Sequence, residues 1–145
     1  MKKSKKSKIR FSALRVVGLI VLTLIGAVLV INLSKTGSNI STPSEISVSE
    51  AYEMRSAGAF ILDVREPQEW QAWHIPGATL IPLGELESRL RELPNDQEIV
   101  VVCRSGNRSA TGRDILTKAG FGNTTSMAGG MNSWISLGYD VVNGP

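Results

Sequence analysis

The chain has 145 residues, of which 42% are hydrophobic and 20% charged, and its formal net charge is +3; this length favours a single folded domain. Residues 1–40 hold eight Lys or Arg and no Asp or Glu, whereas residues 41–145 hold eight basic and thirteen acidic residues and carry −5, so no nucleic acid is expected as a partner. The single cysteine excludes an intramolecular disulfide and a Cys-based zinc site, and with His74 as the only histidine no metal site is expected.

The chain begins with a basic stretch, residues 1–15, followed by an uncharged stretch, residues 16–34. The eighteen most apolar of these residues would span about 27 Å as a helix, close to the bilayer's hydrocarbon thickness of about 30 Å. We therefore expect a transmembrane anchor at residues 16–34, a cytoplasmic tail at residues 1–15, and the remainder facing the extracytoplasmic side of the cell membrane. A cleaved signal peptide, which would leave a secreted or periplasmic protein, is the alternative. Residues 35–45 predict a flexible tether.

From Ile46 onward, short apolar runs alternate with segments of helical character. This alternation predicts an α/β fold, in which helices cover both faces of a parallel sheet. Ligands of such sheets bind outside the carboxyl ends of the strands, and Cys103 directly follows the strongest predicted strand. In chain order we expect a helix over 50–57 capped by Ser49, a strand over 59–64, a helical turn over 67–73, a strand over 79–81, a helix over 85–93, strands over 98–102 and 123–127 on either side of a helix over 108–119, and a last helix over 131–137.

The segment after this strand reads Cys103-Arg104-Ser105-Gly106-Asn107-Arg108 and leads into a predicted helix. Successive N–H groups of such a loop, together with the free N–H groups at a helix start, form an anion-binding nest. The two arginines add positive charge, and Gly106 permits a backbone conformation closed to other residues. These features lower the pKa of a thiol from its ordinary value of about 8.5 and favour a nucleophilic thiolate, which requires no metal or organic cofactor. A small buried hydrophobic role for Cys103 is the alternative.

Four motifs resemble the rhodanese family, and they occur in family order between residues 46 and 142. They are the loop CRSGNRS at 103–109, Asp63-Val64-Arg65-Glu66 with Glu69-Trp70, His74-Ile75-Pro76-Gly77-Ala78, and the GGxxxW pattern from Gly129 to Trp134. The resemblance implies a rhodanese-like domain over residues 46–145, with a parallel five-stranded sheet and helices on both faces. It also implies a thiosulfate sulfurtransferase.

The resemblance also implies roles for individual residues. Cys103 would carry the persulfide, and the backbone from Arg104 to Arg108 would cradle a small anionic sulfur donor, with both arginines contacting it. Asp63 and Arg65 would support the site from behind, although a structural ion pair or turn cap is an equal interpretation. The acceptor would be cyanide or a thiol, including the thiol of a partner protein, since the chain has no second cysteine.

Other aromatic residues near the motifs are interpreted as structural: His74 as a hydrogen-bonding residue, and Trp70 and Trp134 as core. One position departs from the family pattern, because Trp73 stands where glycine is usual. We therefore expect the local turn, and the rim of the pocket, to differ.

Two other functions compete with sulfur transfer. A cysteine phosphatase or arsenate reductase of related fold has five residues between its cysteine and arginine and a histidine before the cysteine. Here four residues separate Cys103 from Arg108, and Val102 precedes the cysteine, which favours sulfur over phosphate. A non-catalytic binding module is the second competitor, and the presence of Cys103 with both arginines argues against it.

Overall fold

The computed structural model describes residues 42–144, so the predicted tail and membrane anchor lie outside the described residues. Within residues 42–144, no helix is both long and apolar enough to cross a membrane. The anchor at residues 16–34 and the extracytoplasmic location therefore stay predictions from the sequence.

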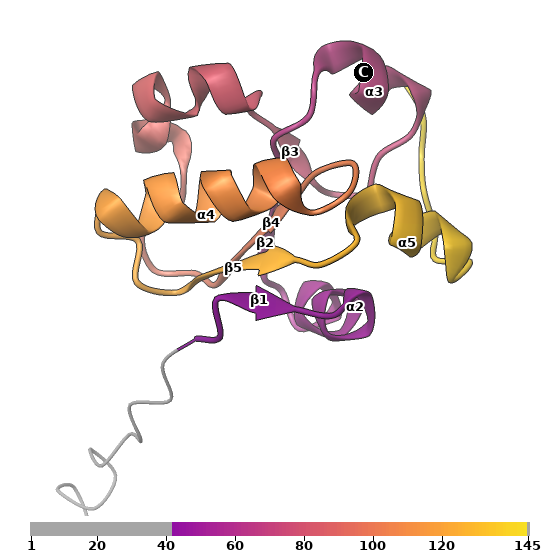
Figure 1. Ribbon diagram of the computed structural model, residues 1–145, viewed down its shortest axis with the longest axis horizontal. Helices are drawn as coiled ribbons and strands as arrows, with labels where there is room; N and C mark the ends of the chain where they lie inside the picture. Colours follow the sequence, from indigo (N-terminus) through magenta and orange to yellow (C-terminus); the bar gives the residue numbers. More distant parts are fainter. Residues whose placement is uncertain (1–41, 145) are drawn as a thin grey trace, which may run out of the picture. The chain divides into compact units, whose positions relative to one another are not determined.

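The described residues form a five-stranded, all-parallel sheet with the strand order β1-β5-β4-β2-β3. Figure 1 shows α4 on one side of this sheet and α2 on the other, which confirms the predicted α/β fold with both faces covered. The strands are β1 (Glu45–Ile46), β2 (Phe60–Asp63), β3 (Thr79–Leu80), β4 (Ile99–Val102) and β5 (Thr124–Met127). The helices are α2 (Val48–Ser56), α3 (Pro67–Ala72), α4 (Asn107–Lys118) and α5 (Gly130–Ser136), with 3-10 segments η1 (Leu83–Ser88) and η2 (Leu90–Glu92).

The central strand β4 is buried along its whole length, as expected for a parallel strand covered on both faces. Its side chains alternate between the faces. Val100 and Val102 pack in the core beneath α2 and α5, whereas Ile99 and Val101 pack in the core beneath α4 and η1. Cys103 follows β4 and belongs to the core beneath α4 and η1. The apolar contacts on both faces of β4 therefore fix the position of the cysteine.

The folded part begins earlier than the sequence analysis predicted. Glu45, which was assigned to the tether, forms β1 and is paired with Ser126 of β5. The following helix begins at Val48 because Ser47, not Ser49, caps it. The Ser47 side chain accepts a hydrogen bond from the Glu50 N–H at 3.2 Å, and the Glu50 carboxylate accepts one from the Ser47 N–H at 2.8 Å. This reciprocal capping box is readable in the sequence as Ser-x-x-Glu.

The predicted helix over 85–93 is wrong in type, because the chain forms the two 3-10 segments η1 and η2 instead. The backbone of Arg89 (φ −114°, ψ 13°) separates them. The Ser88 hydroxyl also donates to the Glu85 carbonyl at 2.8 Å, a local bond that competes with regular helix. Leu86 and Leu93 are nevertheless buried, so the leucine spacing correctly identified the core face.

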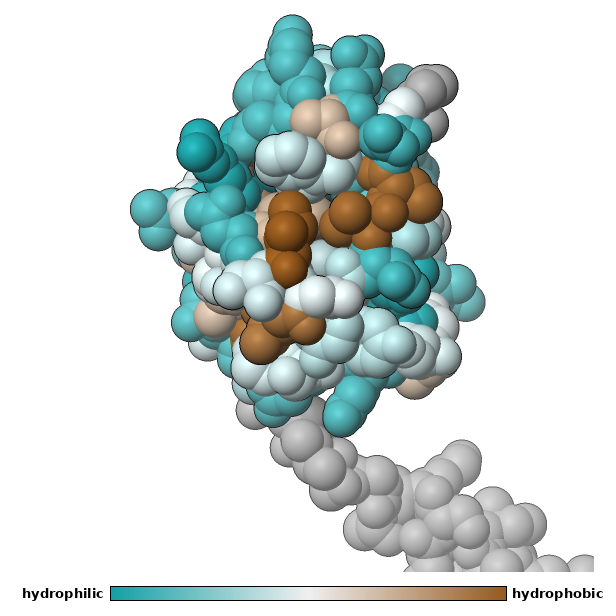
Figure 2. Space-filling model, turned by 90° about the vertical axis from the view of Figure 1, so that its right-hand side faces the viewer, coloured by the Kyte–Doolittle hydropathy of each residue, from teal (hydrophilic) through white to brown (hydrophobic). Residues whose placement is uncertain are grey.

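Exposed apolar side chains are concentrated toward the carboxyl-terminal end of the chain. The side chains are those of Ile135, Leu137, Val141 and Val142, which are 39–58% exposed. Figure 2 shows apolar surface on the face that includes α5 and the carboxyl-terminal segment. The other large exposed apolar residues of the described part are Tyr52 and Trp73.

Candidate active site

Cys103 lies at the carboxyl end of β4 and is 1% exposed, so its sulfur forms the floor of the site. The backbone after it turns back over the sulfur, and the Gly106 N–H donates to Cys103 Sγ at 3.1 Å. Gly106 has φ +106°, and a Cβ at this position would lie 3.3 Å from the Gly129 nitrogen. Glycine is therefore needed here for both conformation and space.

The first turn of α4 supplies a second group beside the sulfur. The Cys103 thiol donates to the Ser109 hydroxyl at 3.6 Å, and that hydroxyl donates to the Gly106 carbonyl at 2.7 Å. A hydroxyl rotates freely between donor directions, so Ser109 can turn its proton toward the sulfur once the thiol ionises. Ser109 belongs to the loop motif, but no role was predicted for it; its position as the third residue of α4, near the free N–H groups of the helix start, is the signal that could have identified it.

Together these groups favour the thiolate. Burial of the sulfur opposes ionisation, but hydrogen bonds from the Ser109 hydroxyl and from the backbone N–H groups of Ser109, Ser105 and Gly106 outweigh it and lower the pKa of the Cys103 thiol. The contacts at the sulfur, the Gly106 N–H and the Ser109 hydroxyl, are consistent with the predicted anion nest, which stays a prediction.

Replacing Ser109 by alanine is expected to raise the pKa of the Cys103 thiol, because one donor to the thiolate is lost. We expect alkylation by iodoacetamide at neutral pH to slow about tenfold, as the loss of one hydrogen bond to a charged group implies. Ser105→Ala is the matched control, since Ser105 contributes its backbone N–H and not its hydroxyl. Equal alkylation rates in the two variants would remove Ser109 from the site.

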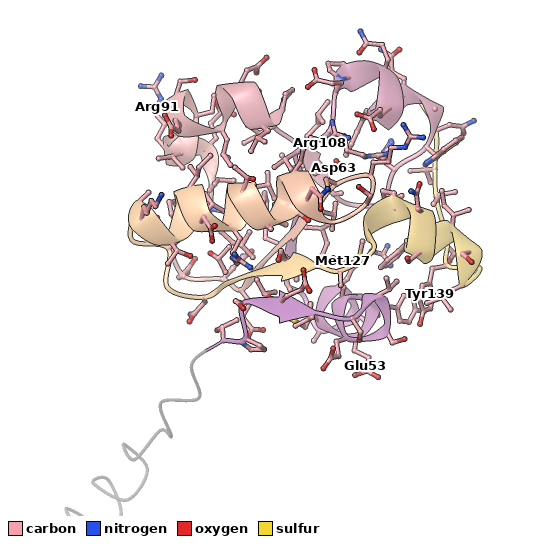
Figure 3. All side chains as sticks on the ribbon, viewed as in Figure 1. Glu53, Asp63, Arg91, Arg108, Met127 and Tyr139 are labelled. Carbon is pink, nitrogen blue, oxygen red and sulfur yellow. The ribbon has the colours of Figure 1, made fainter. Side chains whose placement is uncertain are left out.

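The structure gives the two loop arginines different surroundings. Arg108, labelled in Figure 3 at the start of α4, forms two hydrogen bonds of 2.8 Å with the Glu69 carboxylate of α3. Arg104 is exposed and has no ion pair among residues 42–144. Asn107, also predicted as a binding residue, is exposed at the first position of α4. Glu69 was quoted only as part of a motif, and its pairing with Arg108 was not predicted.

Asp63 and Arg65 form a buried ion pair beside the loop, with relative exposures of 0% and 2%. The Arg65 guanidinium donates to both Asp63 carboxylate oxygens, and it also donates to the backbone carbonyls of Trp73 at 2.8 Å and Glu69 at 3.4 Å. Arg65 thus fastens the end of β2 to α3. No hydrogen bond within the described residues joins this pair to Cys103, so the geometry fits a structural ion pair that positions α3.

The amino-terminal turn of α5 holds the loop from the opposite side. The Met131 N–H donates to the Cys103 carbonyl at 2.8 Å, and the Asn132 N–H donates to the Arg104 carbonyl at 3.0 Å. These bonds keep the two carbonyls pointed at α5 and away from the sulfur. A Cβ at Gly130 would lie 2.6 Å from the Arg104 carbonyl carbon and 2.7 Å from its oxygen, and would also clash with the Cys103 carbonyl. Gly130, the first residue of α5, therefore permits the close approach of this helix to the loop.

Trp73 does not strain the turn that was expected to differ. Its φ of −168° is ordinary extended backbone, and its side chain is 46% exposed. The next residue, His74, is buried; its Nδ1 lies 3.1 Å from the Trp70 carbonyl oxygen, and its ring stacks on Trp70 at a centroid distance of 3.6 Å. His74 therefore has structural contacts, as interpreted from the sequence, and Trp134 is fully buried in the core.

A parallel sheet, a buried cysteine at the end of its central strand and a loop N–H directed at the sulfur define an α/β protein with a cysteine site at the carboxyl edge of the sheet. Residues 47–137 match the model of the Rhodanese-like domain, so the chain belongs to this family.

Named relatives agree with this assignment. The chain is 36% identical over 91 residues to the thiosulfate sulfurtransferase GlpE of Pseudomonas entomophila, covering 63% of this chain and 84% of the relative. It is 37% identical to the crystal structure of a rhodanese-related protein from Thermoplasma volcanium, with a TM-score of 0.65, covering 69% of this chain and 98% of that one.

A further relative is a candidate sulfur carrier protein of Bacillus subtilis, YrkF, which is 39% identical over 102 residues. That match covers 68% of this chain but only 55% of the relative. Sulfurtransferase activity is thus supported at the level of the family, whereas the donor, the acceptor and the mechanism of this chain are matters for proposal.

Proposed function

We propose that the protein transfers sulfane sulfur through a persulfide on Cys103. The observation that carries this proposal is the set of donors around the sulfur, led by the 3.1 Å bond from the Gly106 N–H. In the first step the thiolate attacks the outer sulfur of thiosulfate, the sulfur–sulfur bond breaks, and sulfite leaves with the bonding electrons. The products are Cys103–S–S⁻ and SO₃²⁻, so charge and atoms balance and no external oxidant or reductant is needed.

In the second step an acceptor attacks the outer sulfur of the persulfide. Cyanide would leave as thiocyanate, and a thiol R–S⁻ would leave as R–S–S⁻, in each case restoring the Cys103 thiolate. The added sulfur extends the reactive atom by about 2 Å from the buried Sγ, toward the exposed residues of the loop. A separate molecule must accept the sulfur, since the chain has no other cysteine.

Mass spectrometry after treatment with thiosulfate tests this proposal. We expect a gain of one sulfur, about 32 Da, on Cys103, and its removal as thiocyanate after cyanide is added. Cys103→Ser should gain and release no sulfur. If the wild type never gained sulfur but hydrolysed an aryl phosphate in a Cys103-dependent manner, the phosphatase function would replace sulfur transfer. If it hydrolysed no aryl phosphate and gained sulfur neither from thiosulfate nor from an organic persulfide, the binding-module interpretation would be favoured.

A further inference from the structure

The ion pair between Arg108 and Glu69 joins the first turn of α4 to α3. The two terminal nitrogens of the Arg108 guanidinium each lie 2.8 Å from an oxygen of the Glu69 carboxylate. The side chains of Arg108 and Glu69 are 31% and 27% exposed. This two-pronged geometry is the strongest form of arginine–carboxylate pairing. Arg108 is the second residue of α4, which begins directly after the loop that follows Cys103, so the pair lies near the site.

The Glu69 carboxylate is held in this position from its own side as well. It accepts a hydrogen bond from the Glu66 N–H at 3.2 Å in the first turn of α3, and its backbone carbonyl accepts from the buried Arg65. Hydrogen bonding to Arg108 lowers the pKa of the Glu69 carboxyl. A fixed negative charge therefore lies beside the first turn of α4.

The charge balance around the sulfur follows from this arrangement. Glu69 neutralises Arg108, and Arg104 is an exposed side chain without an ion pair in the described part of the chain. The loop amides and Ser109 stabilise one negative charge at the sulfur, and of the two loop arginines only the exposed Arg104 is without a carboxylate partner in the described residues.

We propose that Glu69 determines donor specificity: it disfavours small dianions such as thiosulfate and fits the site to a donor with at most one negative charge, an organic or protein-borne persulfide. This inference rests on the proposed sulfur transfer. The Cys103 thiolate attacks the outer sulfur of R–S–SH, the sulfur–sulfur bond breaks, and R–S⁻ leaves, so that Cys103–S–SH is formed. The acidic proton stays on the transferred sulfur or is lost to water, and no net oxidation occurs.

The test compares two donors on the full-length wild type and on Glu69→Gln. The donors are thiosulfate and the persulfide of 2-mercaptoethanol, and the rate of sulfur loading on Cys103 is followed by mass spectrometry. The ratio of the two rates is used because it cancels any change in the fraction of thiolate. We expect Glu69→Gln to raise the thiosulfate-to-persulfide ratio about fivefold or more, because a carboxylate is removed and Arg108 is released to bind the dianion.

Glu53→Gln is the matched control, since it removes the same charge from the exposed face of α2, on the other side of the sheet from α4 (Figures 1 and 3). This variant should keep the wild-type ratio. Glutamine can still accept the Glu66 N–H at the start of α3, so folding should be retained. A second measurement varies the salt concentration: added salt should raise the wild-type ratio by screening the carboxylate, and more so than in Glu69→Gln.

Two results would overturn the inference, and they are distinguishable. If both donors load sulfur and the ratio is the same in all three proteins, Glu69 has no role in specificity and the proposed function stands. If neither donor loads sulfur onto any of the proteins, the proposed sulfur transfer is wrong, and so is this inference.

Discussion

Gly130→Ala is expected to reduce sulfur uptake from thiosulfate by more than about a hundredfold, the loss that an ångström-scale misplacement of reacting groups can cause. The new methyl group would overlap the carbonyls of Cys103 and Arg104. Those carbonyls accept the amides of Met131 and Asn132, so either α5 or the loop must move. When the Cys103 and Arg104 carbonyls no longer accept hydrogen bonds from α5, the loop loses its orientation, and its N–H groups no longer point at the Cys103 sulfur.

The measurement for this prediction combines thiosulfate loading with urea unfolding followed by tryptophan fluorescence. Gly138→Ala is a matched control, because Gly138 also has positive φ (+76° against +57° for Gly130) but has open space around it. It should lose only about 1 kcal/mol of stability and retain sulfur uptake. Gly130→Ala should lose more stability as well as activity. Equal behaviour of the two variants would show that the contact of α5 with the loop is unimportant.

Asp63→Asn is expected to lower the free energy of unfolding by about 3–5 kcal/mol, the loss typical of breaking a buried ion pair from one side. The variant leaves the Arg65 guanidinium buried without a counter-charge, although its bonds to the Trp73 and Glu69 carbonyls remain. Because Arg65 also holds α3 through these two carbonyls, Asp63→Asn should increase the mobility of α3, the helix that contains Glu69.

Urea unfolding measures this loss, and Asp96→Asn is the control because Asp96 is exposed; its effect should stay within about 0.5 kcal/mol. Replacing both partners by apolar residues, Asp63→Leu with Arg65→Met, should recover much of the loss, since neither charge then remains buried. A loss below about 1 kcal/mol for Asp63→Asn would contradict the view that this pair fastens β2 to α3.

The features that the sequence predicted are those encoded within a few consecutive residues. The all-apolar strand β4, the cysteine after it and the glycine-containing turn into α4 are contiguous, so their local pattern predicted a buried strand that ends at Cys103 and a helix that follows the loop. The boundaries of most elements differ from the predicted ones by one or two residues, for example Asn107–Lys118 for the helix expected over 108–119.

The features that the sequence did not predict depend on contacts between distant segments. Glu69 and Arg108 are 39 positions apart, and nothing in either motif alone shows that the carboxylate neutralises the arginine expected to bind the donor. The bonds from α5 to the loop likewise connect residues of two separate motifs. The short strand β1 was missed because two residues carry too little pattern, and its place is set by pairing with β5.

We expect the loop amides and the Ser109 hydroxyl to hold negative charge at the Cys103 sulfur. The most direct test is the rate of alkylation of Cys103 by iodoacetamide as a function of pH, which reports the thiol pKa because only the thiolate reacts. Since hydrogen bonds lower this pKa, the rate should reach half its plateau below the value of about 8.5 that is ordinary for a free cysteine, and the thiolate should persist as the pH falls toward neutrality. A midpoint at or above that ordinary value would contradict the account.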